Sequence, residues 1–109
     1  MKFFETVYEN LKKVPCGKVT TYGMLAKMCG NPKMSRQVGW ALHVNPDNKT
    51  IPCHRVVNRE GYLSGGFAFG GIEIQKLLLE NEGIKVSDDF KVIDFEKHLY
   101  KQFEEDLIL

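Results

Sequence analysis

The sequence predicts a mainly α-helical protein with a single winged helix-turn-helix-like domain and a small β-hairpin. Three observations support this fold class. The chain has 109 residues, fewer than the roughly 150 of an average domain, which favours one unit over 1–109. Several segments place apolar residues at helical spacing. Two of these segments meet across a tight turn at Gly30-Asn31, and this is the outline of a helix-turn-helix.

Composition excludes several classes of protein. With 43% hydrophobic and 27% charged residues, the chain is typical of a globular domain, and not of a disordered, collagenous or disulfide-scaffold protein. The start lacks the apolar region of a signal peptide and no stretch is long enough to span a membrane, so we expect a cytoplasmic protein. Cys16, Cys29 and Cys53 form no Cys-x-x-Cys pair, so we expect reduced thiols and no cysteine-rich zinc site.

Charge is distributed unevenly along the chain. Residues 1–79 hold 11 Lys and Arg against 5 Asp and Glu, a net charge of +6, whereas residues 80–109 hold 4 against 9, a net charge of −5. A basic body with an acidic tail from about residue 84 favours a polyanionic partner, although an ordinary solvated surface gives the same pattern.

The first half of the chain predicts three helices. The first ends before Pro15; the second is capped by Thr20 or Thr21 and stops at Gly30; and the third begins at Asn31-Pro32. Their apolar faces comprise Phe3, Phe4, Val7, Tyr8, Leu11 and Val14; Met24, Leu25 and Met28; and Met34, Val38, Ala41 and Leu42.

The second half predicts a hairpin and two further helical segments. Val56-Val57 and Tyr62-Leu63 flank a four-residue loop and would form the hairpin, or wing. Ile74, Leu77 and Leu78 mark a helix ending near Gly83, and the tail from Lys85 predicts a strand-like piece followed by a short helix.

The most informative local feature is Pro52-Cys53-His54-Arg55. A base or a positive environment converts a cysteine to the nucleophilic thiolate, so we expect Cys53 alone among the three thiols to have a lowered pKa. In an extended strand His54 would point away from Cys53, so the pair needs a turn or helix start after Pro52. The alternative, which these two residues alone favour, is a buried small cysteine beside a core histidine.

Longer motifs along the chain favour a reactive Cys53 over a structural one. They are Thr21-Tyr22-Gly23, Gly30-Asn31-Pro32, Ser35-Arg36-Gln37-Val38-Gly39, Asn45-Pro46, Pro52-Cys53-His54-Arg55-Val56 and Glu82-Gly83. In the order and approximate spacing of these motifs, the chain resembles the alkylguanine-DNA alkyltransferases (methylated-DNA-protein-cysteine methyltransferases) from about Val7 to Gly83. Pro-Cys-His-Arg-Val is the signature of that family.

The resemblance implies a catalytic group. Cys53 would accept the alkyl group, His54 would draw off its proton through a water, Glu82 would orient the imidazole and Asn45 would brace the network. Since a thioether has no hydrolysis route, each molecule would act once, and no metal or other cofactor is expected.

The resemblance also implies a partner, double-stranded DNA containing alkylated guanine, bound by a monomer and with no membrane involved. Arg36 would fill the gap left by a flipped base, and Tyr22 would turn the target's backbone and donate to that base. Without the motifs, Arg36 would be a solvated helix arginine and Tyr22 a core tyrosine. The remaining candidates for DNA contact are Ser35, Gln37 and Ser64, whereas Trp40 and His43 are assigned to packing.

Three departures from the family leave alternatives open. Longer members carry an amino-terminal domain to which nothing here corresponds, and the glycine-rich segment 65–71, which would line the alkyl pocket, differs in length. The tail after Gly83 is similar to the alkyltransferase-like proteins, which usually replace the acceptor cysteine with tryptophan, bind alkylguanine and recruit excision repair. Because Cys53 is retained, we expect transfer. Lesion binding without transfer, or a regulator with an inert cysteine, are the alternatives.

Overall fold

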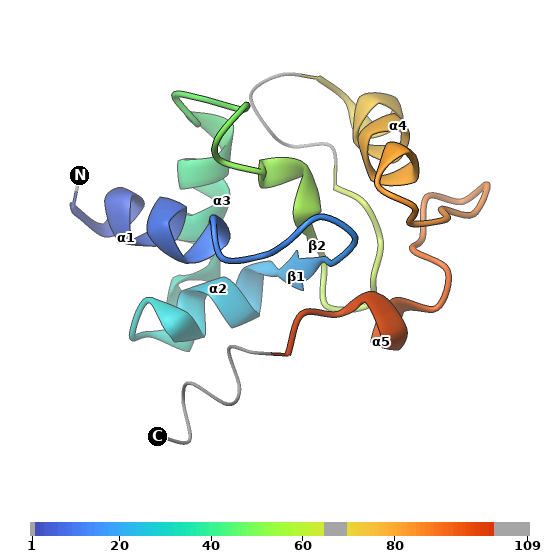
Figure 1. Ribbon diagram of the computed structural model, residues 1–109. Helices are drawn as coiled ribbons and strands as arrows, with labels where there is room; N and C mark the ends of the chain where they lie inside the picture. The colour runs from blue at the N-terminus through green and yellow to red at the C-terminus, as the bar shows by residue number, and fades with distance from the viewer. Residues whose placement is uncertain (1, 65–69, 102–109) are drawn as a thin grey trace.

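The computed structural model describes residues 2–64 and 70–101 and is mainly helical, which confirms the predicted class (Figure 1). No helix within these two ranges is long and apolar enough to cross a membrane. The elements in chain order are α1 Lys2–Leu11, β1 Thr20–Thr21, α2 Tyr22–Met28, the 3₁₀ helix η1 Pro32–Met34, α3 Ser35–His43, the 3₁₀ helix η2 Cys53–Arg55, β2 Val56–Val57, α4 Ile72–Asn81 and α5 Phe95–His98.

Local capping signals set the helix-turn-helix. The Thr21 side chain caps α2 by accepting from the Met24 amide at 3.1 Å, and Gly30 has φ +100°, a left-handed conformation that suits a residue without Cβ. The Asn31 side chain then accepts from the Lys33 amide at 2.9 Å and starts η1, which leads directly into α3. The predicted cap of the second helix at Thr21 and its stop near Gly30 are therefore confirmed. Asn31-Pro32 starts a 3₁₀ helix, and α3 itself begins at Ser35, three residues later than Pro32.

The first core cluster lies among the helices α1, α2 and α3. Each helix contributes apolar residues at helical spacing, and the segment before β2 closes the cluster from the other side (Figure 1). Its buried members are Val7, Leu11, Val14, Leu25, Ala26, Val38, Ala41, Leu42, Ile51, Cys53 and Val56.

The strand pairing differs from the expected hairpin, which was wrong. β2 pairs in parallel with β1, with Thr20 opposite Val56, and Tyr62 forms an isolated bridge with Lys91. Both residues of β2 are buried, and a short strand covered on both faces is typical of parallel pairing. The Asn58 side chain accepts from the amides of Glu60 and Tyr62, both at 2.9 Å, and so ties up the amide that a hairpin would use.

A second core cluster contains Val19, Val57, Leu63, Leu79, Ile84, Val86 and Val92. β2 joins the two clusters, because Val56 belongs to the first and Val57 to the second. The predicted strand-like piece and short helix of the tail are confirmed by an antiparallel bridge between Val86 and Val92 and by α5. The segment after α5 lies beside the strand region, with the Tyr100 amide donating to the Val19 carbonyl at 2.8 Å.

Gly61 offers a test of how the tail is packed. It has φ +93°, and a Cβ there would lie 2.9 Å from Cγ of Phe95. Gly61→Ala should therefore lower the free energy of unfolding by about 2–4 kcal/mol, since strain and overlap add. Gly39→Ala in α3, where a Cβ meets nothing within 4 Å, should raise it by roughly 0.5–1 kcal/mol. Urea unfolding measures both, and equal effects of the two would contradict the packing of Gly61 on Phe95.

Candidate functional site

A tight turn presents the cysteine motif. η2 begins directly after Pro52, and the Arg55 amide donates to the Pro52 carbonyl at 3.0 Å. This is the helix start that the sequence required if His54 is to act beside Cys53. Cys53 is 1% exposed and belongs to the first core cluster. The turn therefore places a buried thiol where core packing meets a polar network.

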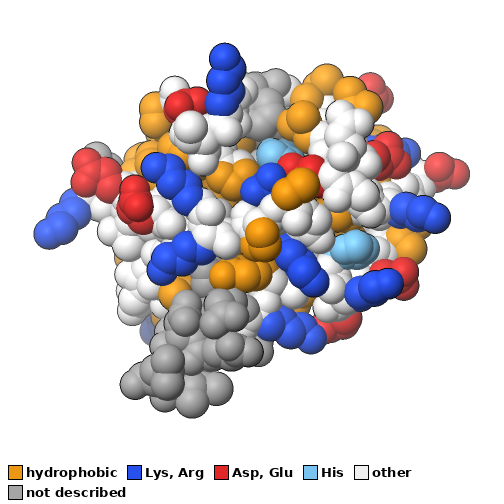
Figure 2. Space-filling view, viewed as in Figure 1, with side chains coloured by type: hydrophobic (Ala, Val, Ile, Leu, Met, Phe, Trp, Pro, Cys, Tyr) orange, Lys and Arg blue, Asp and Glu red, His pale blue; other side chains and the backbone are white. Residues whose placement is uncertain are grey.

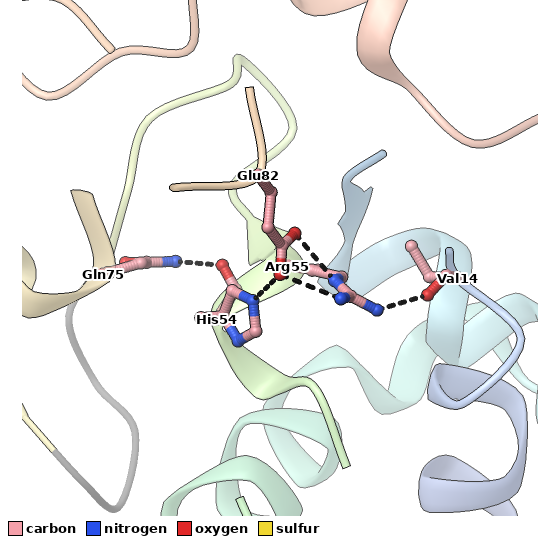
Figure 3. Close-up of polar contacts among 5 residues, drawn as sticks. All are labelled: Val14, His54, Arg55, Gln75 and Glu82. Atoms are coloured by element: carbon pink, nitrogen blue, oxygen red, sulfur yellow. Dashed lines mark hydrogen bonds and ion pairs between the residues drawn. The ribbon is translucent and has the colours of Figure 1, made fainter. Parts of the chain in front are cut away.

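That network converges on the carboxylate of Glu82, just after α4 (Figure 3). His54 Nε2 lies 2.7 Å from Oε2 of Glu82, and Arg55 donates through Nε at 2.9 Å and Nη2 at 2.8 Å to its two oxygens. Arg55 Nη1 also donates to the Val14 carbonyl at 2.8 Å. The side chains of His54, Arg55 and Glu82 are only 9%, 16% and 13% exposed, so solvent screens these charge-assisted bonds weakly.

The charges and burial of the network determine the protonation state and the tautomer of the His54 imidazole. Burial alone would raise the pKa of Glu82, but hydrogen bonds from Arg55 and His54 outweigh it and lower that pKa. Burial lowers the pKa of His54, and the raising effect of Glu82 only partly opposes this. Neutral His54 must therefore donate through Nε2 to the ionised carboxylate, which leaves the Nδ1 lone pair as a base.

Nδ1 of His54 is buried and has no hydrogen-bond partner among the described residues. The same ring thus carries an anchored nitrogen and an unengaged one. A histidine held in one tautomer by a carboxylate is the arrangement that prepares a general base.

The expected lowering of the Cys53 pKa is wrong. Burial raises the pKa of the Cys53 thiol, and the hydrogen bond from the Asn45 side chain only partly opposes the rise. The physical reason is that Arg55 is committed to Glu82 and His54 is neutral, so neither supplies a free positive charge to the sulfur. Cys53 is therefore a thiol at rest, and a base is needed to ionise it.

Asn45 and Gln75 hold the backbone on either side of the cysteine. Asn45 Nδ2 donates to the Ile51 carbonyl at 3.0 Å, and its role in the catalytic group stays a prediction. Gln75 of α4 is fully buried and donates to the His54 carbonyl at 3.1 Å (Figure 3). It also donates to the Val56 carbonyl at 2.9 Å. Gln75 was not among the residues predicted for the site, although its helical spacing from Ile72 and Leu79 indicates a polar side chain on the buried face of the helix.

Two tyrosines lie near the thiol. The hydroxyl of Tyr22, at the start of α2, lies 2.5 Å from that of Ser64. Burial raises the pKa of Tyr22, and the Cys53 sulfur adds to the rise. Burial and Cys53 raise the pKa of Tyr8 in the same way, and its hydroxyl donates to the Ala41 carbonyl at 2.8 Å. The structure therefore brings Tyr22 and Ser64 together close to Cys53, and adds Tyr8, which the sequence suggested only for packing.

The other candidates for DNA contact lie at the start of α3. Arg36 and Gln37 are exposed, and Ser35 is half-buried, with its hydroxyl donating to the Pro32 carbonyl at 3.4 Å. Figure 2 shows lysine and arginine side chains spread across the middle of one face of the protein, with most acidic side chains toward its edges. Arg36 itself is exposed and takes no part in the hydrogen bonds described for the Glu82 network.

The assignment of Trp40 and His43 to packing is wrong. Trp40 is 59% exposed and His43 is exposed as well, with the two rings in an edge contact of 6.5 Å between centroids. α3 buries Val38, Ala41 and Leu42 instead, which turns positions 40 and 43 outward.

Two further expectations concern the pocket and metal binding. Positions 65–69 of the glycine-rich segment lie outside the described residues. Within the described ranges, no group of three or more His, Cys, Asp or Glu could hold a metal ion.

The sequence and the fold are similar to those of known proteins. A methylated-DNA–protein-cysteine methyltransferase of Methanosarcina acetivorans is 44% identical over 82 residues, 75% of this chain and 51% of its own. A solved structure of Schizosaccharomyces pombe Atl1 in complex with damaged DNA containing O6-carboxymethylguanine matches with a TM-score of 0.78 and 34% identity, over 92% of this chain and 95% of that one. Mycobacterium tuberculosis OGT in complex with DNA matches with a TM-score of 0.71 and 37% identity, over 76% of this chain and 49% of that one.

The chain spans about half the length of the curated methyltransferases that it matches. The family model described as "6-O-methylguanine DNA methyltransferase, DNA binding domain" matches residues 2–84, about three quarters of the sequence. These residues include the helix-turn-helix, the cysteine turn and Glu82. The chain therefore belongs to the O6-methylguanine-DNA methyltransferase family.

Proposed function

We propose that this protein repairs DNA by flipping alkylated guanine out of the duplex and transferring the alkyl group irreversibly to its own Cys53. The observation that carries the proposal is the pairing of a buried thiol with a neutral histidine whose Nδ1 is unengaged and whose Nε2 is anchored on Glu82. A lesion-binding surface alone does not need a nucleophile beside a prepared base. Family membership and the names of the relatives support the same chemistry.

The proposed step balances as a single displacement. His54 Nδ1 takes the thiol proton, through a bridging water, and the Cys53 sulfur attacks the alkyl carbon attached to guanine O6. The sulfur–carbon bond forms as the carbon–O6 bond breaks, and guanine leaves with its electron pair and takes up one proton. Tyr22, close to the thiol and bonded to Ser64, is the candidate to donate to the flipped base. Glu82 stabilises the imidazolium that forms.

The proposed partner is double-stranded DNA that contains an alkylated guanine, and α3 would contact it. Residues 22–49, which form the helix-turn-helix and the following loop, hold four Lys and Arg against one Asp. The second helix of a helix-turn-helix is the element that enters a DNA groove. Arg36 is exposed at the amino-terminal end of α3, and in this proposal it would fill the space that a flipped base leaves.

A second candidate function is recognition of alkylguanine without transfer, followed by recruitment of excision repair. One observation favours it: S. pombe Atl1 matches this chain almost end to end, over 92% of this chain and 95% of its own. The retained Cys53, in contact with Asn45 and beside His54, is the observation against it.

The mass of the intact protein separates the two functions. After incubation with duplex DNA containing O6-methylguanine, we expect the protein to gain one methyl group in place of a proton, located on Cys53 by peptide mapping. Cys53→Ala should gain nothing and still bind the duplex, because the alanine keeps the turn and α3 intact. An unchanged mass of the unsubstituted protein, with binding preserved, would establish the lesion-binding function instead.

The rate of transfer should depend on pH through His54. Because the pKa of His54 is lowered in the folded protein, Nδ1 stays unprotonated down to pH values below the ordinary histidine pKa of about 6.5. The single-turnover rate constant should be level near neutral pH and should fall only below about pH 6.5, as Nδ1 takes up a proton. Rapid-quench transfer from methylated duplex measures the profile.

Glu82→Gln provides the control for this profile. Glu82 raises the pKa of His54, so its loss should move the acid limb to still lower pH while the level part of the profile drops. An acid limb centred above pH 6.5 in the unsubstituted protein would contradict the role of His54 as a neutral base.

Arg36 should matter only when a base has to leave the duplex. Arg36→Ala should slow transfer from methylated duplex by about one to two orders of magnitude, because unstacking and unpairing cost a few kcal/mol that the filler offsets. Transfer from free benzylguanine, which needs no extrusion, should change little. Lys33→Ala removes the same charge from the preceding turn and should leave the ratio of the two rates near its original value. Equal slowing of both substrates by Arg36→Ala would instead assign the arginine to the fold or the pocket.

A further inference from the structure

Trp40 lies in the middle of α3 with more than half of its surface exposed. Its side chain is 59% exposed, and Val44, one turn further on, is 52% exposed. Neither residue belongs to either core cluster. The only ring contact that the structure describes for Trp40 is the edge contact with His43, at an interplanar angle of 86°. A large aromatic surface therefore faces outward from a helix whose other face is fully packed.

Trp40 and Arg36 share one side of α3. The helix buries Val38, Ala41 and Leu42, so positions 36, 40 and 43, spaced by four and three residues, form a stripe on the opposite side. The rise of an α-helix places Trp40 about 6 Å along the axis from Arg36. This distance is comparable to the spacing of about 3.4 Å between successive base pairs, so a duplex bound along this side of α3 would meet the indole close to the gap proposed for Arg36.

The surroundings of Trp40 favour a polyanion, whereas those of the other exposed apolar residues do not. The segment 22–49 carries Lys27, Lys33, Arg36 and Lys49 against the single acidic residue Asp47. Leu77 on α4 is comparably exposed, at 54%, but its neighbours one turn away on the helix surface are Glu73 and Glu80. The charge around Trp40 therefore selects a nucleic acid, and that around Leu77 does not.

We propose that Trp40 is a second DNA-contacting side chain, whose indole stacks on the nucleotides beside the gap and stabilises the flipped state together with Arg36. This inference rests on the proposed function, because it requires α3 to lie on duplex DNA. Aromatic stacking on bases is insensitive to sequence, which suits a protein that must examine any sequence context.

Trp40 is the only tryptophan in the chain, so its fluorescence reports on this contact alone. We expect addition of duplex DNA containing O6-methylguanine to quench the emission of the Cys53→Ala protein and to protect the indole from acrylamide. Fluorescence anisotropy of a dye-labelled duplex follows binding in the same samples. Saturated binding with unchanged emission and unchanged acrylamide quenching would overturn the role of Trp40 and leave the proposed function standing. Failure to bind the duplex at all would overturn both.

Substitutions measure the contribution of the contact. Trp40→Ala should weaken binding of the methylated duplex on the order of tenfold, Trp40→Phe should recover most of that loss, and transfer from free benzylguanine should remain unchanged. Leu77→Ala, the matched exposed apolar residue on α4, should leave both properties as they were. Duplex affinity of Trp40→Ala equal to that of the unsubstituted protein would overturn the proposal. Circular dichroism compares the folding of the variants, and the fluorescence of the unsubstituted side chain decides the question if Trp40→Ala fails to fold.

Discussion

The carboxylate of Glu82 is the group on which the site depends. It accepts from both Arg55 and His54, and Arg55 in turn reaches the Val14 carbonyl after α1. One ionised group therefore connects the end of α4, the cysteine turn and the end of the first helix. Because the group is largely buried, its removal would leave an arginine without compensation in a poorly solvated place. The charge that stabilises the turn is also the charge that selects the tautomer of His54, so stability and chemistry share one interaction.

The position of the turn between the two cores explains how a reactive cysteine can also be a core residue. Cys53 and Val56 pack in the first cluster and Val57 in the second, so the residues between them are restrained from both sides. Gln75 satisfies the two carbonyls that this crossing leaves exposed to α4. Burial of the sulfur raises the pKa of Cys53. In the proposed reaction the thiolate would exist only when a substrate occupies the site and His54 takes the proton, which limits its reaction with other electrophiles.

The features that were predicted correctly depend on residues that are close together in the sequence. Thr21, Gly30 and Asn31 act within one helical turn of themselves, so their capping roles can be inferred from neighbouring letters. The need for a helix start after Pro52 was also local, and η2 meets it. The pairing of β2 with β1 brings together residues more than thirty positions apart, and no turn signal encodes it. The pKa of Cys53 depends on the same kind of distant contact, through burial and through the engagement of Arg55 by Glu82.

Trp40 is different, because the sequence did contain the signal. The apolar positions predicted for the third helix already placed Val38, Ala41 and Leu42 inside, which leaves residue 40 outside by helical periodicity. The aromatic residue type of Trp40 favours packing, but the helical spacing of the buried residues predicts an outward position, and the spacing is the better guide. Gln75 is the opposite case. It is a polar residue that helical spacing places on the buried face, and its two hydrogen bonds to backbone carbonyls compensate for its burial.

The return of the tail to the strand region has a consequence for the order in which the protein assembles. Val19 bridges Leu99 in parallel, a contact between residues eighty positions apart in the chain, whereas α1, α2 and α3 pack against close neighbours in sequence. Closing so long a loop costs entropy before its contacts compensate. The three-helix part thus has the low contact order of a rapidly folding unit, and the tail completes the second core as a late event.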